Sequence, residues 1–185
     1  MAMRYEARLS GEGGQGLILA GVILAEAVGI YDGKNVTQSQ SYGPESRGGK
    51  SKSEVIISDE EIDYPKATRV DLLLSLTQES CNEYVKDLKE GGHLVVDATY
   101  VPSIPPGSFQ VYQVPMIQIA REEIGKEIVA NIVALGVITE ISGIVTREAI
   151  KKAVLARVPK GTEALNTRAL EAGFAAGRTA MVPKV

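Results

Sequence analysis

Short apolar runs, each about as long as a β-strand, recur through the first two thirds of the chain. Runs of four to eight residues that end at glycine, proline or polar turns are typical of strands. Asn35–Tyr42 is mainly polar and is expected to be half exposed, whereas the apolar run Val70–Leu76 is expected to lie inside a parallel sheet. The pattern predicts strands at Tyr5–Ser10, Asn35–Tyr42, Ser53–Ser58, Val70–Leu76, His93–Asp97 and Phe109–Val114.

Helical segments separate these strands and fill the last third of the chain. Leu17–Val28 is apolar nearly all round, so this helix is expected to be buried on several sides. Thr77 can cap a helix over Glu79–Lys89, which is expected to end at Gly91 and Gly92. Three later helices are expected over Ile128–Ile141, Arg147–Val158 and Glu163–Arg178, the last with Thr162 as its cap.

Strands that alternate with helices indicate βαβ units and a parallel sheet. The predicted fold is therefore α/β, with a mostly parallel sheet covered by helices on both faces and a helical C-terminal third. The length of 185 residues fits a single domain over residues 1–185.

Charge and composition exclude several functions. The net charge is −3 and no run of lysine or arginine occurs, so non-specific nucleic-acid binding is disfavoured. No uncharged apolar run reaches the roughly 20 residues that a membrane-spanning helix needs. We therefore expect a cytoplasmic protein that binds neither nucleic acid nor membranes.

The chain lacks the side chains of a complete catalytic or metal site. It has one cysteine, Cys81, and one histidine, His93, too few for an iron–sulfur cluster, a zinc site or a nucleophile–histidine pair. No catalytic residue and no metal ligand is predicted. His93 and Asp71 are expected to be structural, whereas Asp97 ends a strand at the edge where open α/β sheets bind ligands.

A glycine loop, Gly11-Glu12-Gly13-Gly14-Gln15-Gly16, joins the first strand to the first helix. Strand, glycine turn and helix together present backbone N–H groups to an anion. The spacing departs from the dinucleotide-binding pattern, and no lysine follows as in a phosphate-binding P-loop. A tight turn that requires glycine explains the loop equally well, but Gln15 favours binding because its amide can contact a ligand.

A second loop, Tyr42-Gly43-Pro44-Glu45-Ser46-Arg47-Gly48-Gly49, follows the second predicted strand. Its glycines allow a partner to approach closely, and the guanidinium of Arg47 suits a carboxylate or a phosphate. Taken alone, a solvated loop with a surface pair between Arg47 and Glu45 explains it somewhat better.

Together, the two loops resemble the gamma subunit of 2-oxoacid:ferredoxin oxidoreductases, and the length and the Tyr-Gly-Pro-Glu form are most similar to the 2-oxoglutarate enzymes. The resemblance implies a supporting subunit of an oxidoreductase complex that decarboxylates a 2-oxoacid, forms an acyl-CoA and reduces ferredoxin. It also implies partner alpha, beta and delta subunits that carry thiamine diphosphate, Mg²⁺ and iron–sulfur clusters, in a homodimer or hetero-oligomer.

The resemblance further assigns residues to two functions. The loop residues Gly11, Gly13, Gly14, Gln15 and Gly16 are expected to face a phosphate, with contact to coenzyme A. The subunit or ligand edge is expected to include Tyr42, Glu45, Arg47 and Gly48.

Two alternatives remain open at this point. The glycine loop alone also fits a freestanding module that binds a nucleotide or coenzyme A. The apolar helices Leu17–Val28 and Ile128–Ile141 fit a structural dimerisation domain without catalysis, because a lone monomer rarely exposes such surfaces.

Overall fold

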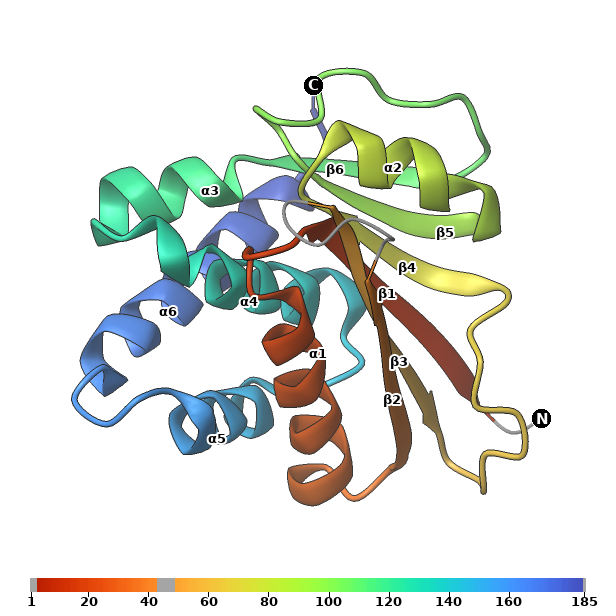
Figure 1. Ribbon diagram of the computed structural model, residues 1–185, viewed down its shortest axis with the longest axis horizontal. Coiled ribbons are helices and arrows are strands. Elements are labelled where there is room, and N and C mark those ends of the chain that lie inside the picture. Colours follow the sequence, from red (N-terminus) through yellow and green to blue (C-terminus); the bar gives the residue numbers. More distant parts are fainter. Residues whose placement is uncertain (1–2, 43–48, 185) are drawn as a thin grey trace.

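The strands form one mixed sheet in the computed structural model, which describes residues 3–42 and 49–184. Within these residues the sheet has six strands in the order β2-β3-β1-β4-β5-β6 (Figure 1). Neighbours from β1 to β6 pair in parallel, whereas β3 runs antiparallel to both β1 and β2. The strands are β1 (Arg4–Glu12), β2 (Asn35–Tyr42), β3 (Lys50–Ser58), β4 (Val70–Ser75), β5 (Leu88–Asp97) and β6 (Gln110–Val114).

The helices cover the two faces of the sheet unevenly. The large core lies between one sheet face and α1, α4, α5 and α6, and a smaller core lies under α2 on the other face (Figure 1). The predicted α/β fold with helices on both faces is confirmed. The helices are α1 (Leu17–Glu26), α2 (Gln78–Tyr84), α3 (Met116–Gln118), α4 (Ala130–Ser142), α5 (Arg147–Arg157) and α6 (Glu163–Ala180). In the described ranges, none combines the length and apolar character needed to cross a membrane.

One predicted helix is wrong in its second half. The helix expected over 79–89 ends at Tyr84, and β5 begins at Leu88 rather than at His93. Leu88 pairs with Val70 of β4, and Gly91 adopts a positive φ of 76° at the irregularity that follows. The glycines therefore interrupt a strand instead of ending a helix.

The two threonines predicted as helix caps behave differently. The Thr77 hydroxyl accepts a hydrogen bond from the Ser80 N–H at 3.2 Å, so this cap is confirmed. Thr162 is the N-cap residue of α6, as predicted, but its hydroxyl makes no capping hydrogen bond to the helix and donates to the Pro159 carbonyl at 2.6 Å.

Part of the sheet face that carries α2 is polar, because loops rather than helices cover it there. Arg8 on β1 is 2% exposed and pairs with Glu54 at 3.3 Å and with Asp87 at 2.7 Å. Its guanidinium also lies 5.3 Å from the ring centre of Tyr84. Such pairing is what allows a buried charge to persist at this position.

Two glycines bring α4 and α6 into backbone contact. A Cβ atom on Gly136 would lie 2.5 Å from the Leu170 carbonyl oxygen, and one on Gly173 would collide with the Val133 carbonyl oxygen. Since the obstructing atoms belong to backbone, the helices could not yield by moving a side chain. The small residues therefore set the distance between α4 and α6.

We predict that Gly173→Ala lowers the free energy of unfolding by about 1–3 kcal/mol, the usual cost of overpacking. Urea denaturation measures the change. Ala175→Gln on the exposed side of the same helix is the control and should change it by less than about 0.5 kcal/mol. Equal effects of the two substitutions would contradict the close-contact explanation.

Candidate functional site

The glycine loop forms a tight turn between β1 and α1. Gly14 has a φ of 93° and Gly16 a φ of 75°, conformations that favour glycine. Gly16 is the N-cap residue of α1 and provides no side chain to bond the first helical N–H groups. The helix therefore begins with bare backbone donors, and the positive end of its dipole is at the loop.

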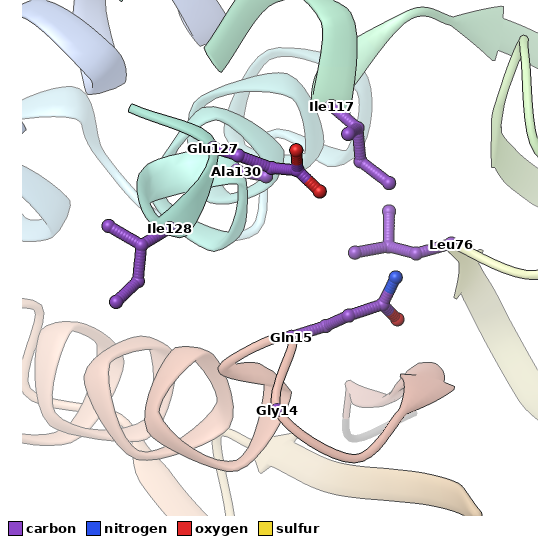
Figure 2. A pocket seen from close by; sticks show the side chains of 7 residues that line it. All are labelled: Gly14, Gln15, Leu76, Ile117, Glu127, Ile128 and Ala130. Atoms are coloured by element: carbon purple, nitrogen blue, oxygen red, sulfur yellow. The ribbon is translucent and has the colours of Figure 1, made fainter. Parts of the chain in front are cut away.

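The amide of Gln15 stabilises this turn. Its Oε1 accepts a hydrogen bond from the Glu12 N–H at 2.7 Å, which identifies this atom as the oxygen. A Cβ atom on Gly11 would collide with the same oxygen, so Gly11 leaves the space in which the amide folds back. The amide nitrogen then points toward Leu76 (Figure 2).

A pocket of about 270 Å³ opens beside the loop, lined by Gly14, Gln15, Leu76, Ile117, Glu127, Ile128 and Ala130. Leu76 follows β4, Ile117 follows β6, and the two loop residues follow β1, so the pocket lies at the carboxyl ends of parallel strands. From the adjacent strands β1 and β4 the chain leaves in opposite directions, toward β2–β3 and toward β5. Open α/β sheets bind ligands at such a point.

One acidic side chain reaches into the pocket from the side opposite Gln15. The Glu127 carboxylate points into the space (Figure 2), and it accepts hydrogen bonds from Arg121 at 2.8 and 3.0 Å. Arg121 also donates to the Tyr100 hydroxyl at 3.0 Å. These hydrogen bonds, first that to Tyr100 and then that to Glu127, raise the pKa of Arg121, so its charge balances the carboxylate.

A larger hollow of about 390 Å³ lies on the other side of Ile128, between the starts of α1, α4 and α6. Its walls are mainly apolar and include Leu19, Ile132 and Leu165. Ile128 lines both spaces and is 78% exposed. An isoleucine so exposed between two hollows is typical of a surface that another molecule covers.

Asn131 holds the starts of α1 and α4 together. Its Nδ2 donates to the Gly16 carbonyl oxygen at 3.1 Å, across 115 residues of sequence. Its Oδ1 accepts from the Ile132 N–H at 2.9 Å near the start of α4, which has no side-chain cap. Two helix N-termini thus meet at the glycine loop, and both direct positive dipole ends toward it.

The family model described as pyruvate ferredoxin/flavodoxin oxidoreductase matches residues 6–176. The chain belongs to this family. In the oxidoreductase family, the 2-oxoglutarate synthase subunit KorC of Methanocaldococcus jannaschii is 52% identical over 174 residues, which cover 93% of both chains.

Two solved structures from the family are also similar. A keto/oxoacid ferredoxin oxidoreductase gamma subunit from Geobacter sulfurreducens has 56% identity and a TM-score of 0.90, with 96% of this chain and 98% of that chain covered. The 2-oxoglutarate:ferredoxin oxidoreductase from Magnetococcus marinus, solved with 2-oxoglutarate, coenzyme A and succinyl-CoA, has 25% identity and a TM-score of 0.85. The match covers 98% of this chain but 32% of that one, so the fold there is part of a longer polypeptide.

Of the second predicted loop, Tyr42–Gly49, only the two end residues belong to the part of the chain that the structure describes. Tyr42 ends β2 with 67% of its surface exposed, whereas Glu45, Arg47 and Gly48 lie outside the described residues. The Gly13 N–H donates to the Gly49 carbonyl oxygen at 2.8 Å. The far end of the second loop therefore lies against the glycine loop.

The isolated polar residues of the predicted strands support the fold. The buried Asp97 carboxylate accepts hydrogen bonds from the backbone N–H groups of Thr99, Tyr100 and Ile117 at 2.9–3.1 Å, so it fixes two loops instead of facing a ligand. Asp71 bonds the Glu6 N–H and Lys89.

His93 and Cys81 also have structural surroundings. The His93 ring meets that of Tyr112 edge to face at 5.6 Å, and burial lowers the pKa of His93. Burial raises the pKa of Cys81 to about 11. The described residues contain no group of three or more histidine, cysteine, aspartate or glutamate side chains that could hold a metal ion.

Sequence reasoning did not identify Glu127 and Ile128, which line the pocket, or Asn131, which lines the hollow, as site residues. The single polar residue Asn131 within an apolar helix was the available signal, because a buried amide needs partners.

We predict that Gly16→Ala destabilises the fold more than Gly14→Ala. Both place a side chain at a positive φ, which costs roughly 1–2 kcal/mol. A Cβ atom at Gly16 would also lie 2.5 Å from Asn131 Nδ2, whereas a Cβ atom at Gly14 would have no other atom within 4 Å. Losing the Asn131 hydrogen bond adds about 1 kcal/mol. Urea unfolding measures both variants, and losses of equal size would show that Asn131 does not couple the two helices.

Proposed function

We propose that this chain is the gamma subunit of a 2-oxoglutarate:ferredoxin oxidoreductase. The complex converts 2-oxoglutarate and coenzyme A to succinyl-CoA and carbon dioxide, and the two electrons released reduce ferredoxin. The observation that carries the proposal is the 52% identity to a 2-oxoglutarate synthase subunit over 93% of both chains. The chain works as a supporting subunit in the cytoplasm and has no activity alone.

The redox and carbanion chemistry belongs to the partner subunits. A chain with one cysteine cannot supply the four thiolates of a typical iron–sulfur cluster. Thiamine diphosphate, Mg²⁺ and the clusters are therefore assigned to the alpha, beta and delta subunits. The matched fold in the longer Magnetococcus marinus chain supports such an arrangement, because covalent fusion keeps neighbouring parts of a complex together.

We assign two roles to the region around the glycine loop. Gly14, Gln15 and the start of α1 face a phosphate group of coenzyme A, since bare N–H groups and a helix dipole favour anions. Gly11 and Gly13 shape the turn, because their surroundings are filled by Gln15 and Gly49.

The apolar hollow beside Ile128 receives a partner subunit, and Tyr42, Glu45, Arg47 and Gly48 belong to the same subunit edge. The exposed isoleucine and the mainly apolar lining support this role for the hollow.

Reconstitution of the complex tests the subunit assignment. Omission of this chain should abolish ferredoxin reduction that depends on 2-oxoglutarate and coenzyme A. Full activity without the chain would refute the proposal, and tight binding of coenzyme A by the isolated chain in calorimetry would favour the freestanding binding module.

We predict that Ile128→Glu weakens assembly of the complex at least tenfold without unfolding the chain. The side chain is 78% exposed, so the substitution costs little in the free subunit, but a charge in the covered interface is unfavourable. Pull-down with the partner subunits measures the effect. Val182→Glu is the matched control, because Val182 is 66% exposed and lies outside both hollows. Equal assembly of the two variants would contradict the interface.

We predict that Gln15→Glu in the assembled complex raises the KM for coenzyme A about tenfold and leaves the KM for 2-oxoglutarate unchanged. Glutamate keeps the oxygen that accepts the Glu12 N–H but replaces the amide nitrogen with a charge that repels phosphate. Steady-state kinetics measure both constants. Glu12→Gln, at an exposed position outside the pocket, is the control. An unchanged KM for coenzyme A would remove the loop from the coenzyme site.

A further inference from the structure

Strand β2 forms an open edge of the sheet. Its residues Asn35–Tyr42 pair with β3 in unbroken register, and in the described part of the chain no strand lies beyond them. The strand carries no charged residue and no proline, and it has no bulge against β3. Natural proteins usually protect an edge with one of these devices, because its free backbone groups pair readily with another strand. The β2 edge is therefore available for pairing.

An apolar stripe on α1 runs beside this edge. Gly29, in the turn that continues α1, lies so close to β2 that a Cβ atom there would be 2.7 Å from Val36 Cγ1. Ile18, Val22 and Ala25 follow the helical spacing that leads to Gly29, so they share its side of the helix. All three are only half-buried. The first charged residue of α1 is Glu26, so no charge interrupts the stripe.

The sequence of β2 is complementary to itself. If two copies run antiparallel about a two-fold axis at Ser39, Val36 faces Tyr42 of the second copy. Thr37 then faces Ser41, and Gln38 faces Gln40. Each pair joins positions of equal parity, which lie on the same face of a strand. An aromatic side chain with a β-branched one and a hydroxyl with a hydroxyl are favourable cross-strand pairs. Two opposed amides can exchange hydrogen bonds, because each carries a donor and an acceptor.

We propose that β2 is an interface between two copies of this chain. The two β2 strands pair antiparallel, so that the sheets of both copies become one continuous sheet. A two-fold axis perpendicular to the sheet brings the Ile18, Val22 and Ala25 stripes of both copies to the same face, where they cover the junction. A second copy is favoured over a foreign strand because all three cross-strand pairs are matched within this one sequence. The interface shares no residue with the two hollows at the glycine loop, although Tyr42 also belongs to the proposed subunit edge, and its test requires no enzymatic activity.

Sedimentation of the full chain tests the interface. The wild type should have twice the chain mass of 19.7 kDa. Ser39→Lys and Ser39→Glu should each be monomeric, because two like charges meet at the axis. An equimolar mixture of these two variants should recover the dimer, since opposite charges then meet. Ser108→Lys, at another exposed serine, is the control and should stay dimeric.

Cross-linking gives an independent result. Ser39→Cys should form a disulfide-linked dimer on mild oxidation, because directly opposed Cβ atoms approach within bonding reach. The native Cys81 is fully buried, so the new thiol is the reactive one.

Two outcomes would overturn the proposal. One is a monomeric wild type at roughly 100 μM, because any interface would then be too weak to be specific. If the Ser39→Lys variant of such a monomer also no longer enters the enzyme complex, the edge binds a different subunit. The other is a dimer that persists in both charged variants.

Discussion

The hydrogen bond from Asn131 to the Gly16 carbonyl oxygen links the first helix to the C-terminal helices at the glycine loop. It ties the first helix, which follows the first strand, to a helix of the C-terminal third. Because of this bond, the glycine turn is held between two helix starts instead of projecting from the sheet. The pocket, the apolar hollow and the position of Ile128 all depend on how closely α1 and α4 approach at this point. Loop and helix form one corner, and the proposed function requires such a preorganised corner for a site shared with other subunits.

The corner combines two surfaces of different chemistry. On one side of Ile128, backbone donors and the Gln15 amide face a small pocket with one neutralised carboxylate. On the other side, the walls are mainly apolar. A ligand with a charged end and a partner with an apolar surface could thus be held next to each other. In the proposed function, such a corner positions molecules for chemistry that takes place on the partner subunits.

Local sequence signals predicted the parts of the structure that local interactions determine. The strand–glycine–helix unit and the Thr77 cap follow from residues within a few positions of one another. Thr162 is the N-cap residue of α6, but its backbone is not extended and its hydroxyl accepts from the Asn166 side chain instead of a helical N–H. The start of β5 was missed because Leu88 is a strand residue only through its pairing with Val70 of β4. Asn131 and Ile128 were not recognised as site residues because the glycine loop lies more than a hundred residues away.

The exposed Ile128 affects how the chain behaves before it assembles with partner subunits. A freshly made copy presents an uncovered isoleucine between two hollows, and similar surfaces on other copies compete for it. If a partner subunit covers Ile128 as proposed, surplus copies are expected to aggregate or to be degraded, and balanced synthesis of the subunits prevents this. In the Magnetococcus marinus relative the same fold is part of a longer polypeptide, so it is always made in equal number with the rest of that chain.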